Sequence, residues 1–389
     1  MKALIDESRS PLPLSQTAYD QQLKVLHVCE TAKGGIATYL RIMRASTSER
    51  YEHYVVLPEH HAGELQGTLK TTTFNSKKRS ILRLGRMLVT ARQVAITEKP
   101  DILFFHSTFS LTAMLFFCLF LPRRPTIYCP HGWAAMQFAP GSMRRKLIAF
   151  AEHHLSKVAD AVVNISAYEQ RYCEANYPKV NGILIENAVE PCDEKPLPSI
   201  VHTSPTQLNI LFVGRLDRQK GFDLLFRAFC EATKARTDLH LHVVGDFVLG
   251  KSQFTAQVAQ SSDVTMHGWK TPREVRSFLD ACDILAVPSR WEGFGLVVAE
   301  SFRSGTPVLA SDRCALPDLV SPDETGWVVP FEQVNWTDAI VRLEKHTLRK
   351  MRDRCLETYE NRFHASRFGH EFDCLFQKMI ECKCSCPTS

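Results

Sequence analysis

Short apolar runs alternate with helix-length segments along most of this chain. The first run, Leu23–Cys29, is apolar with β-branched residues and leads through the adjacent glycines Gly34 and Gly35 into a helix-compatible stretch. Continuous apolar runs of this length are typical of strands buried on both faces of a parallel sheet. The pattern recurs in the first half of the chain at Tyr54–Leu57, Ile102–Phe105, Thr126–Cys129, Ala161–Ile165 and Ile183–Ile185.

A second series of the same kind follows a proline-rich segment at residues 191–207. Its strands are expected at Asn209–Val213, Leu239–Val244, Val264–Met266, Ile284–Val287 and Pro307–Ala310. Two such series in 389 residues predict an α/β protein with two doubly wound parallel sheets of similar size. Because ligands of open α/β sheets bind at the carboxyl ends of the strands, we expect the two domains to face a cleft.

The expected organisation places a tail before the first strand and a helix after the second domain. The boundaries are 1–20 for the tail, 21–190 for the N-terminal domain, 191–207 for the linker, 208–360 for the C-terminal domain and 361–389 for a C-terminal helix, packing back on the N-terminal domain, with a cysteine-rich tail. Most of the 13 cysteines lie in apolar segments, which favours reduced, buried thiols. For the tail cysteines at 382, 384 and 386, a frayed terminus is favoured over a metal site. The N-terminal residues contain no apolar secretory segment, so we expect a cytoplasmic protein.

Positive charge is concentrated in one part of the chain. Hydrophobic residues make up 44% of the sequence and charged residues 23%, which fits a globular protein and excludes a disordered or collagen-like one. The formal net charge is +5, yet residues 70–157 carry 14 basic side chains and three acidic ones. Such a block favours contact with an anionic surface, such as phosphate, acidic lipid or nucleic acid.

Two helical stretches hold much of this charge. In residues 77–93, Arg79, Arg83 and Arg86 share one face at helical spacing, and residues 144–157 begin with three basic side chains. Cationic amphipathic helices lie at anionic headgroups, so we favour a peripheral contact with a membrane surface over an ordinary solvated face. The sequence contains no nucleic-acid-binding motif, and no nucleic acid partner is expected. The apolar segment 102–121 is interrupted by polar residues, including His106, and this favours a strand, turn and helix over a membrane span. For His106 itself, a core position and an acceptor-side position remain open.

The segment 288–300 follows one of the expected strands and contains a Gly-Phe-Gly turn. Its glycines permit a tight backbone that exposes amide groups at the start of the next helix, and such a helix N-terminus is an anion site. Glu292 precedes the turn and can reach a hydroxyl group beside a bound phosphate. Glu300 lies one to two turns into the helix and can accept two hydrogen bonds from a ribose-like diol.

The segment 214–221 also follows directly on a strand and is basic. Its cations, Arg215, Arg218 and Lys220, have a single local carboxylate, that of Asp217, so we expect that they are not all paired within the protein. Cations placed in this way suit a diphosphate. A solvated basic turn explains this loop equally well when it is taken alone.

Together, these two loops resemble the donor-binding motifs of family 4 retaining glycosyltransferases, which have the two-domain GT-B fold. The motifs are Gly-Arg-x4-Lys-Gly at residues 214–221 and Glu-Gly-Phe-Gly-x4-Glu at residues 292–300. Supporting pieces, among them His131-Gly132 and His267-Gly268, occur in the family's order between about Leu23 and about Arg342. The resemblance implies two Rossmann-like domains, with the donor site in the C-terminal domain and the acceptor on the N-terminal side.

The resemblance also implies which residues act on the reacting groups. Arg215 and Lys220 would neutralise the diphosphate of a nucleotide sugar and stabilise the departing nucleoside diphosphate. Glu292 would hold hydroxyls of the transferred sugar, and His131 would lie near its reaction centre. Because cations are expected at the diphosphate and the sequence contains no Asp-x-Asp motif, no metal or other cofactor is expected.

Further positions would bind the donor through the backbone or through a carboxylate. Glu300 would hold the ribose, and the backbone at Gly268 and Trp269 would contact the base. Amide groups would hold the sugar and phosphate oxygens, and they come from Gly34, Gly35, Gly293, Phe294, Gly295, Leu296 and Val297. Departures from the family pattern at Ser301, at 314–318 and at 187–190 leave the identity of the sugar open.

The expected function is therefore transfer of a hexose from a nucleoside-diphosphate sugar, with UDP favoured, to a saccharide acceptor. The resemblance implies retention of anomeric configuration. An acceptor on a lipid carrier, in polysaccharide or lipopolysaccharide biosynthesis, fits the basic block. Two alternatives remain: a sugar-nucleotide epimerase of the same fold, and a non-enzymatic peripheral membrane protein with a vestigial site.

Overall fold

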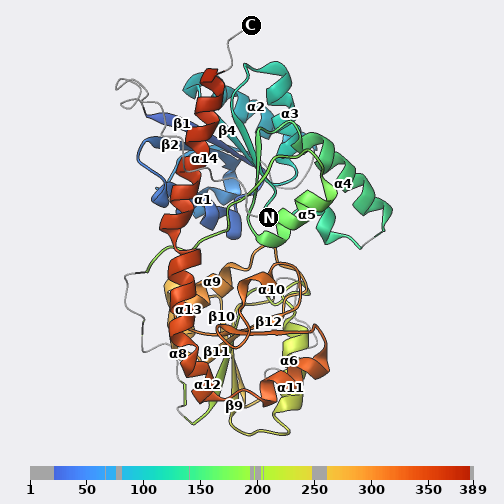
Figure 1. Ribbon diagram of the computed structural model, residues 1–389, viewed down its shortest axis with the longest axis vertical. Coiled ribbons are helices and arrows are strands. Elements are labelled where there is room, and N and C mark those ends of the chain that lie inside the picture. Colours follow the sequence, from blue (N-terminus) through green and yellow to red (C-terminus); the bar gives the residue numbers. More distant parts are fainter. Residues whose placement is uncertain are drawn as a thin grey trace, which may run out of the picture.

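The computed structural model consists of two parallel sheets, each covered by helices, with one sheet in each half of the chain (Figure 1). It describes residues 22–385 apart from 66, 76–80, 140, 193–196, 198–202, 205 and 248–260. The expected strand–turn–helix series and the two Rossmann-like sheets are confirmed. Arg79 lies outside the described residues.

The first sheet has seven strands in the order β3-β2-β1-β4-β5-β6-β7, and every pair is parallel. The strands are β1 (Leu23–Cys29), β2 (Tyr51–Pro58), β3 (Lys70–Phe74), β4 (Ile102–His106), β5 (Thr126–Cys129), β6 (Ala161–Asn164) and β7 (Gly182–Leu184). The apolar pattern predicts all of them except β3. This edge strand reads Lys-Thr-Thr-Thr-Phe and exposes its first four residues, so it lacks the apolar run that marks a buried strand.

Helices cover both faces of this sheet because its strands are apolar on both sides. Alternate strand residues pack with α1 on one face, in a core that includes Val25 and Phe104, and with α2 and α3 on the other, in a core that includes Leu26 and Phe105. The helical segments are α1 (Gly35–Ser46), η2 (Glu59–Glu64), α2 (Ile81–Glu98), α3 (Ser110–Phe120), η3 (Ala134–Gln137), α4 (Met143–Ser156) and α5 (Ala167–Asn176). Across the described residues, no helix is both long enough and apolar enough to cross a membrane.

The second sheet has six parallel strands in the order β10-β9-β8-β11-β12-β13. The strands are β8 (Leu208–Val213), β9 (Leu239–Val244), β10 (Val264–Gly268), β11 (Ile284–Val287), β12 (Val308–Ser311) and β13 (Gly326–Val329). The described helices between and after them are α6 (Phe222–Ala232), α8 (Pro272–Ala281), α9 (Leu296–Arg303), α10 (Leu316–Leu319), α11 (Gln333–Val341), α12 (Lys345–Lys350) and α13 (Arg352–Thr358).

The end of the chain returns from the second sheet to the first. A π-helical turn, Tyr359–Phe363, connects α13 to the long α14 (Ala365–Ser385), which lies along the N-terminal half in Figure 1. α14 packs its aromatic side chains on α1 and on the first sheet, where Phe372 lies near both Tyr39 and Phe104. The last helix therefore belongs to the core of the N-terminal half.

Strand order reverses at one point in each sheet, between β1 and β4 in the first and between β8 and β11 in the second. At such a switch point the loops that follow the two central strands turn to opposite faces and leave room for a ligand at the carboxyl ends. Gly34 and Gly35 follow β1, the basic 214–221 loop follows β8, and the 288–295 loop follows β11. Three of the expected donor-binding segments therefore lie at switch points.

Candidate active site at the interdomain boundary

The loops after β8 and β11 pack against each other at the switch point of the second sheet. Gly221, the residue before α6, has φ 72°, and a Cβ placed on it would lie 1.8 Å from the carbonyl oxygen of Pro288. A side chain is excluded there by backbone conformation and by contact alike. Gln219 joins the loops further, because its side-chain Nε2 donates to the Trp291 oxygen at 3.2 Å and its own carbonyl accepts from Arg290 N at 2.8 Å.

Lys220 and Glu292 form an ion pair between these two loops. Lys220 Nζ lies 2.5 Å from Glu292 Oε1, and the Ser289 hydroxyl donates to the same oxygen at 2.9 Å. The Glu292 side chain is buried, whereas that of Lys220 is 23% exposed. A cation held on a buried carboxylate in this way remains accessible to an anionic ligand from its open side.

Two of the three loop cations have protein partners among the described residues. Lys220 pairs with Glu292, and Arg215 lies 3.3 Å from Asp217 and donates to Gln219 Oε1 at 2.9 Å. Local sequence cannot reveal the partner of Lys220, because Glu292 is 72 residues away and arrives through the neighbouring strand. The Arg215 side chain is nearly half exposed, so its ion pair with Asp217 is weak. Replacing this pair by contact with an anionic ligand therefore costs little free energy.

The Gly-Phe-Gly turn places the start of α9 beside this ion pair. Gly295, the residue before α9, has φ 103°, a left-handed conformation that favours glycine. The Phe294 side chain is buried against Phe363, so only its backbone can serve a ligand. The first turn of α9 carries amide groups that have no partner within the helix, as the expected anion site requires.

Glu300 is the second carboxylate of the motif and lies within α9. Burial raises the pKa of its carboxyl group, while the charges of Arg303 and Lys220 act in the opposite direction. Glu300 is therefore close enough to Lys220 to feel its charge. The structure thus brings together four of the expected donor-binding elements: Lys220, Glu292, Glu300 and the N-terminus of α9.

The N-terminal half approaches the same loop from the other side. A Cβ placed on Gly35, at the start of α1, would lie 3.8 Å from Leu296 Cδ1, so the first turns of α1 and α9 face each other. His131 follows β5 and has φ 51°. Its neighbour Gly132 contacts the loop after β11, since a Cβ placed on Gly293 would lie 3.7 Å from Gly132 Cα.

The sequence offered no reason to select Glu169, yet this residue lies where the two halves touch. It belongs to the first turn of α5, and its Oε1 would lie 3.2 Å from a Cβ placed on Gly293. The side chain is buried, Oε2 accepts a hydrogen bond from Ile165 N, and Oε1 has no hydrogen-bond partner among the described residues. Burial raises the pKa of this carboxyl group to about 8. The pattern Ser166-x-x-Glu169 signals a helix start and says nothing of the boundary.

Gly268 and Trp269 lie apart from this group. Gly268 is the last residue of β10, the outer strand of the second sheet, and Trp269 follows it; the Gly268 oxygen accepts a hydrogen bond from Gly245 N at 2.9 Å. The Trp269 side chain is 61% exposed. Within the described residues, no hydrogen bond or ion pair joins either residue to Lys220 or Glu292, so contact with a nucleotide base stays a prediction.

The basic helix expected at 77–93 differs from the prediction at Arg83. This side chain is buried, not exposed on a membrane-facing surface, and its guanidinium lies 3.3 Å from Glu30 Oε1 and donates to the Glu30 carbonyl. Helical spacing alone cannot tell which face of α2 meets the sheet. The second basic stretch forms α4, which lies at the surface and exposes apolar side chains: Met143, Leu147 and Phe150 are 77%, 71% and 62% exposed.

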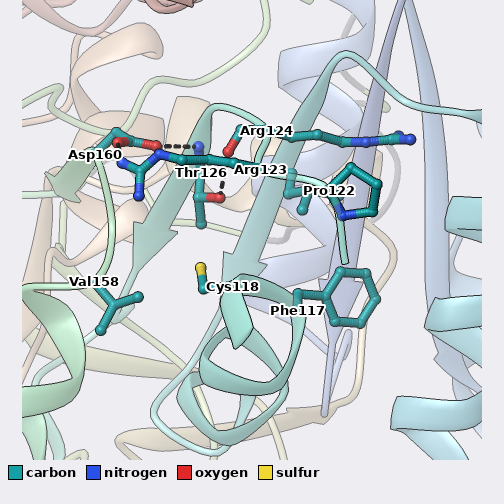
Figure 2. Close-up of a pocket in the computed structure, with 9 residues that line it drawn as sticks. Phe117, Cys118, Pro122, Arg123, Arg124, Thr126, Val158 and Asp160 are labelled. Carbon is teal, nitrogen blue, oxygen red and sulfur yellow. Dashed lines mark hydrogen bonds and ion pairs between the residues drawn. The ribbon is translucent and has the colours of Figure 1, made fainter. Parts of the chain in front are cut away.

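Figure 2 shows a small cavity at the amino ends of the strands of the first sheet, away from the candidate site. It is lined by Phe117, Arg123, Thr126 and Asp160 among others. Its volume of about 10 Å³ holds about one water molecule. Asp160 accepts hydrogen bonds from Arg123 Nη2 at 2.6 Å and Thr126 N at 2.9 Å, so this carboxylate ties the start of β5 to the chain before β6. The cavity is too small for a nucleotide and lies at the amino ends of the strands.

In the described part of the chain, no group of three or more His, Cys, Asp or Glu side chains could hold a metal ion.

Comparison with known proteins identifies the family. The two parallel sheets, together with family models that match both halves of the chain, define a glycosyltransferase of the GT-B class. Residues 33–191 match the model described as Glycosyltransferase Family 4, and residues 198–362 match Glycosyl transferases group 1. The chain belongs to the group 1 glycosyltransferases.

Two relatives illustrate what the chain is similar to. The chain is 28% identical over 357 residues to an uncharacterized 41.2 kDa protein in the cps region of Klebsiella pneumoniae, covering 88% of this chain and 96% of that protein. It is 36% identical over 150 residues, or 34% of each chain, to D-inositol 3-phosphate glycosyltransferase of Corynebacterium aurimucosum.

Solved structures share the fold at low sequence identity. Sucrose-phosphate synthase from Thermosynechococcus elongatus has a TM-score of 0.79 at 19% identity, over 93% of this chain and 100% of that chain. HepE from Anabaena, solved in complex with UDP, has a TM-score of 0.72 at 17% identity, over 92% and 100%. WaaG, a glycosyltransferase involved in lipopolysaccharide biosynthesis, has a TM-score of 0.69 at 15% identity, over 91% and 99%.

Proposed function

We propose that this glycosyltransferase transfers a hexose from a UDP sugar, with retention, to a saccharide acceptor. The observation that carries the proposal is the ion pair of Lys220 with Glu292, which joins the loop after β8 to the loop that leads into α9, with Arg215 on the first of these loops. Departure of UDP places negative charge on the diphosphate, and fixed cations and amide groups stabilise that charge most strongly when water is excluded. UDP is favoured because HepE, which shares the fold, is named as a complex with UDP and with UDP-glucose.

The ion pair between Lys220 and Glu292 gives each residue a part in donor binding. When a diphosphate binds, Lys220 can shift its Nζ toward the phosphate oxygens, since its side chain is partly exposed. Glu292 then has a free oxygen, which can accept a hydrogen bond from a sugar hydroxyl. Glu292 thus holds Lys220 when no donor is bound and holds the sugar when the donor is bound.

We further propose that the acceptor is carried by a lipid and that α4 rests on the cytoplasmic face of an anionic membrane. Met143, Leu147 and Phe150 recur at helical spacing on one exposed face, and Arg144 and Lys146 beside them are exposed. An apolar stripe with adjacent cations complements an acidic headgroup region. The proposal agrees with neighbours named for lipopolysaccharide biosynthesis and with the Klebsiella relative from a cps region.

Incubation with a UDP sugar in the absence of acceptor separates this function from its alternative. A sugar-nucleotide epimerase isomerises the donor alone, whereas a transferase leaves the sugar intact or hydrolyses it slowly. Analysis of the nucleotide sugar by proton NMR distinguishes these outcomes, and Glu292→Ala provides the control. Accumulation of an epimerised UDP sugar would refute the transferase. Transfer to an added saccharide with the donor's anomeric configuration preserved in the product is the expected result.

A further inference from the structure

Four histidines form a continuous hydrogen-bonded row that ends at His131. His53, His27 and His106 lie on the adjacent strands β2, β1 and β4, and His131 follows β5, the next strand. His53 Nδ1 lies 2.9 Å from His27 Nε2, His27 Nδ1 lies 2.9 Å from His106 Nε2, and His106 Nδ1 lies 2.9 Å from His131 Nε2. The row crosses the switch point of the first sheet and connects its interior with the candidate active site.

Thr47, at the far end, determines the direction of every bond in the row. Its hydroxyl hydrogen is donated to the Met43 carbonyl oxygen at 2.7 Å. Thr47 Oγ1 lies 3.0 Å from His53 Nε2, so the oxygen accepts this bond and His53 Nε2 carries the hydrogen. A neutral imidazole carries one ring hydrogen, and His53 Nδ1 must therefore accept from His27.

The same rule passes along the row to the boundary. His27 donates from Nε2 and accepts at Nδ1 from His106, which in turn accepts at Nδ1 from His131 Nε2. His131 therefore carries its hydrogen on Nε2, and its Nδ1 is left with a lone pair. Nδ1 makes no hydrogen bond within the described part of the chain, and His131 as a whole residue is half-buried.

The surroundings keep all four rings uncharged, which the rule requires. His27 and His106 are fully buried, and burial lowers the pKa of both well below the usual range. Burial also lowers the pKa of His53 and His131 to about 3. Aromatic side chains cover the row: Tyr39 packs edge-on against His131, and Phe376 of α14 lies against His53.

We propose that Thr47, His53, His27 and His106 are positioning residues that fix the tautomer of His131, so that Nδ1 accepts a hydrogen bond from a hydroxyl group of the saccharide bound at the boundary. This inference rests on the proposed function, because it assumes a saccharide beside His131. The row fixes orientation and does not carry protons away, because it ends on a backbone carbonyl, which is not a proton acceptor at neutral pH. A neutral His131 also adds no positive charge that would compete with Lys220 for the diphosphate.

Nitrogen NMR of histidine-labelled protein tests the tautomer without substrate. His131 signals are assigned by their loss in His131→Gln. In the wild type, His131 Nδ1 should resonate as an unprotonated nitrogen and Nε2 as a protonated one. Thr47→Val removes the acceptor at the end of the row, so the Nδ1 signal should shift toward the protonated position, and Thr47→Ser should restore it. A protonated Nδ1 in the wild type, or an unchanged signal in Thr47→Val, would overturn the inference.

Kinetics then test the consequence at the active site. Thr47→Val should lower kcat by about tenfold, the effect of about one lost hydrogen bond, with thermal stabilisation by UDP unchanged. Thr97→Val is the matched control, since this threonine also donates to a carbonyl one turn earlier at a helix end but contacts no histidine. If Thr47→Val does not fold, His53→Leu interrupts the row one step further in, with the same expected results. Failure of UDP to bind the wild type would refute the proposed function and leave the NMR result standing, whereas an unchanged kcat with an altered Nδ1 signal would refute the role assigned to the row.

Discussion

A buried carboxyl group at the domain boundary, that of Glu169, makes stability depend on pH. Its folded pKa of about 8 exceeds its usual value of 4.5, so between these values the folded protein binds more protons than the unfolded chain. The contribution of Glu169 to the free energy of unfolding therefore falls as pH rises through this range. This contribution is largest below pH 4.5. Ionisation forces a charge into a site where one oxygen has no partner.

Glu169→Gln should remove this dependence. We expect the variant to be more stable than the wild type at pH 8 by about 1–3 kcal/mol and nearly equal to it at pH 5, because the amide keeps the shape and cannot ionise. Chemical denaturation at the two pH values measures the difference. Glu174→Gln, an exposed position on the same helix, is the control. Equal changes with pH in the wild type and Glu169→Gln would show that Glu169 does not titrate in this range.

Single residues also show where sequence reasoning reaches its limit. Spacing within a motif pointed to Lys220 and Glu292, and the structure places them in contact. Their mutual ion pair was not predictable from either loop, because it depends on which strands are neighbours. Glu169 and the histidine row were missed for the same reason: each histidine taken alone is an ordinary core residue, and only the order of the strands aligns them.

At the scale of elements, α4 exposes an apolar face to solvent. Leu147→Glu and Phe150→Glu should each weaken binding to vesicles of phosphatidylcholine and phosphatidylglycerol by about tenfold or more, since each removes an apolar side chain worth about 1.5–3 kcal/mol when buried. Vesicle co-sedimentation measures this. Leu82→Glu on α2, which replaces an equally exposed leucine, should leave binding unchanged. If neither α4 variant changes vesicle binding, α4 does not contact the membrane and its exposed face is an ordinary solvated surface.

The elements themselves were largely predictable, and the exceptions have physical causes. Buried parallel strands are apolar throughout, so their positions follow from the sequence. Two edge strands, β3 and β13, were not among the expected strands. β3 was missed because its polar residues face solvent, and β13 is only four residues long, begins with a glycine and is half-buried in its middle. Arg83 of α2 was expected at the surface but turns inward to a buried partner, Glu30, and a charge with a hidden partner looks from sequence like a surface charge.

At the scale of the whole molecule, the charge on the donor is expected to be met by protein cations. Activity should therefore be unchanged, within about twofold, after dialysis against EDTA, because Arg215 and Lys220 supply the positive charge that a metal ion supplies elsewhere. Release of UDP from a UDP sugar is the measurement, with and without added Mg²⁺ or Mn²⁺. Activity that disappears in EDTA and returns with either ion would refute metal-independent transfer.

The division into two sheets was also visible in the sequence, since two strand–turn–helix series flank a proline-rich segment. The return of α14 to the first sheet, its cover over the histidine row and the contact of Gly132 with the Gly293 loop are properties of the assembled molecule. Pattern and motif thus locate the candidate donor-binding loops, whereas the contacts around these loops depend on the packing of distant residues.

Thermal unfolding with nucleotides tests the central claim most directly, because a ligand that binds only the folded protein raises Tm. The site between the two sheets should make UDP or a UDP sugar raise Tm in the wild type more than GDP or ADP does. Arg215→Gln and Lys220→Gln should each reduce that rise strongly, while Lys234→Gln, an exposed cation on the same half of the chain, should preserve it. No rise with any of the three nucleotides, or an equal rise in Arg215→Gln and Lys220→Gln, would contradict a nucleotide-sugar site at these loops.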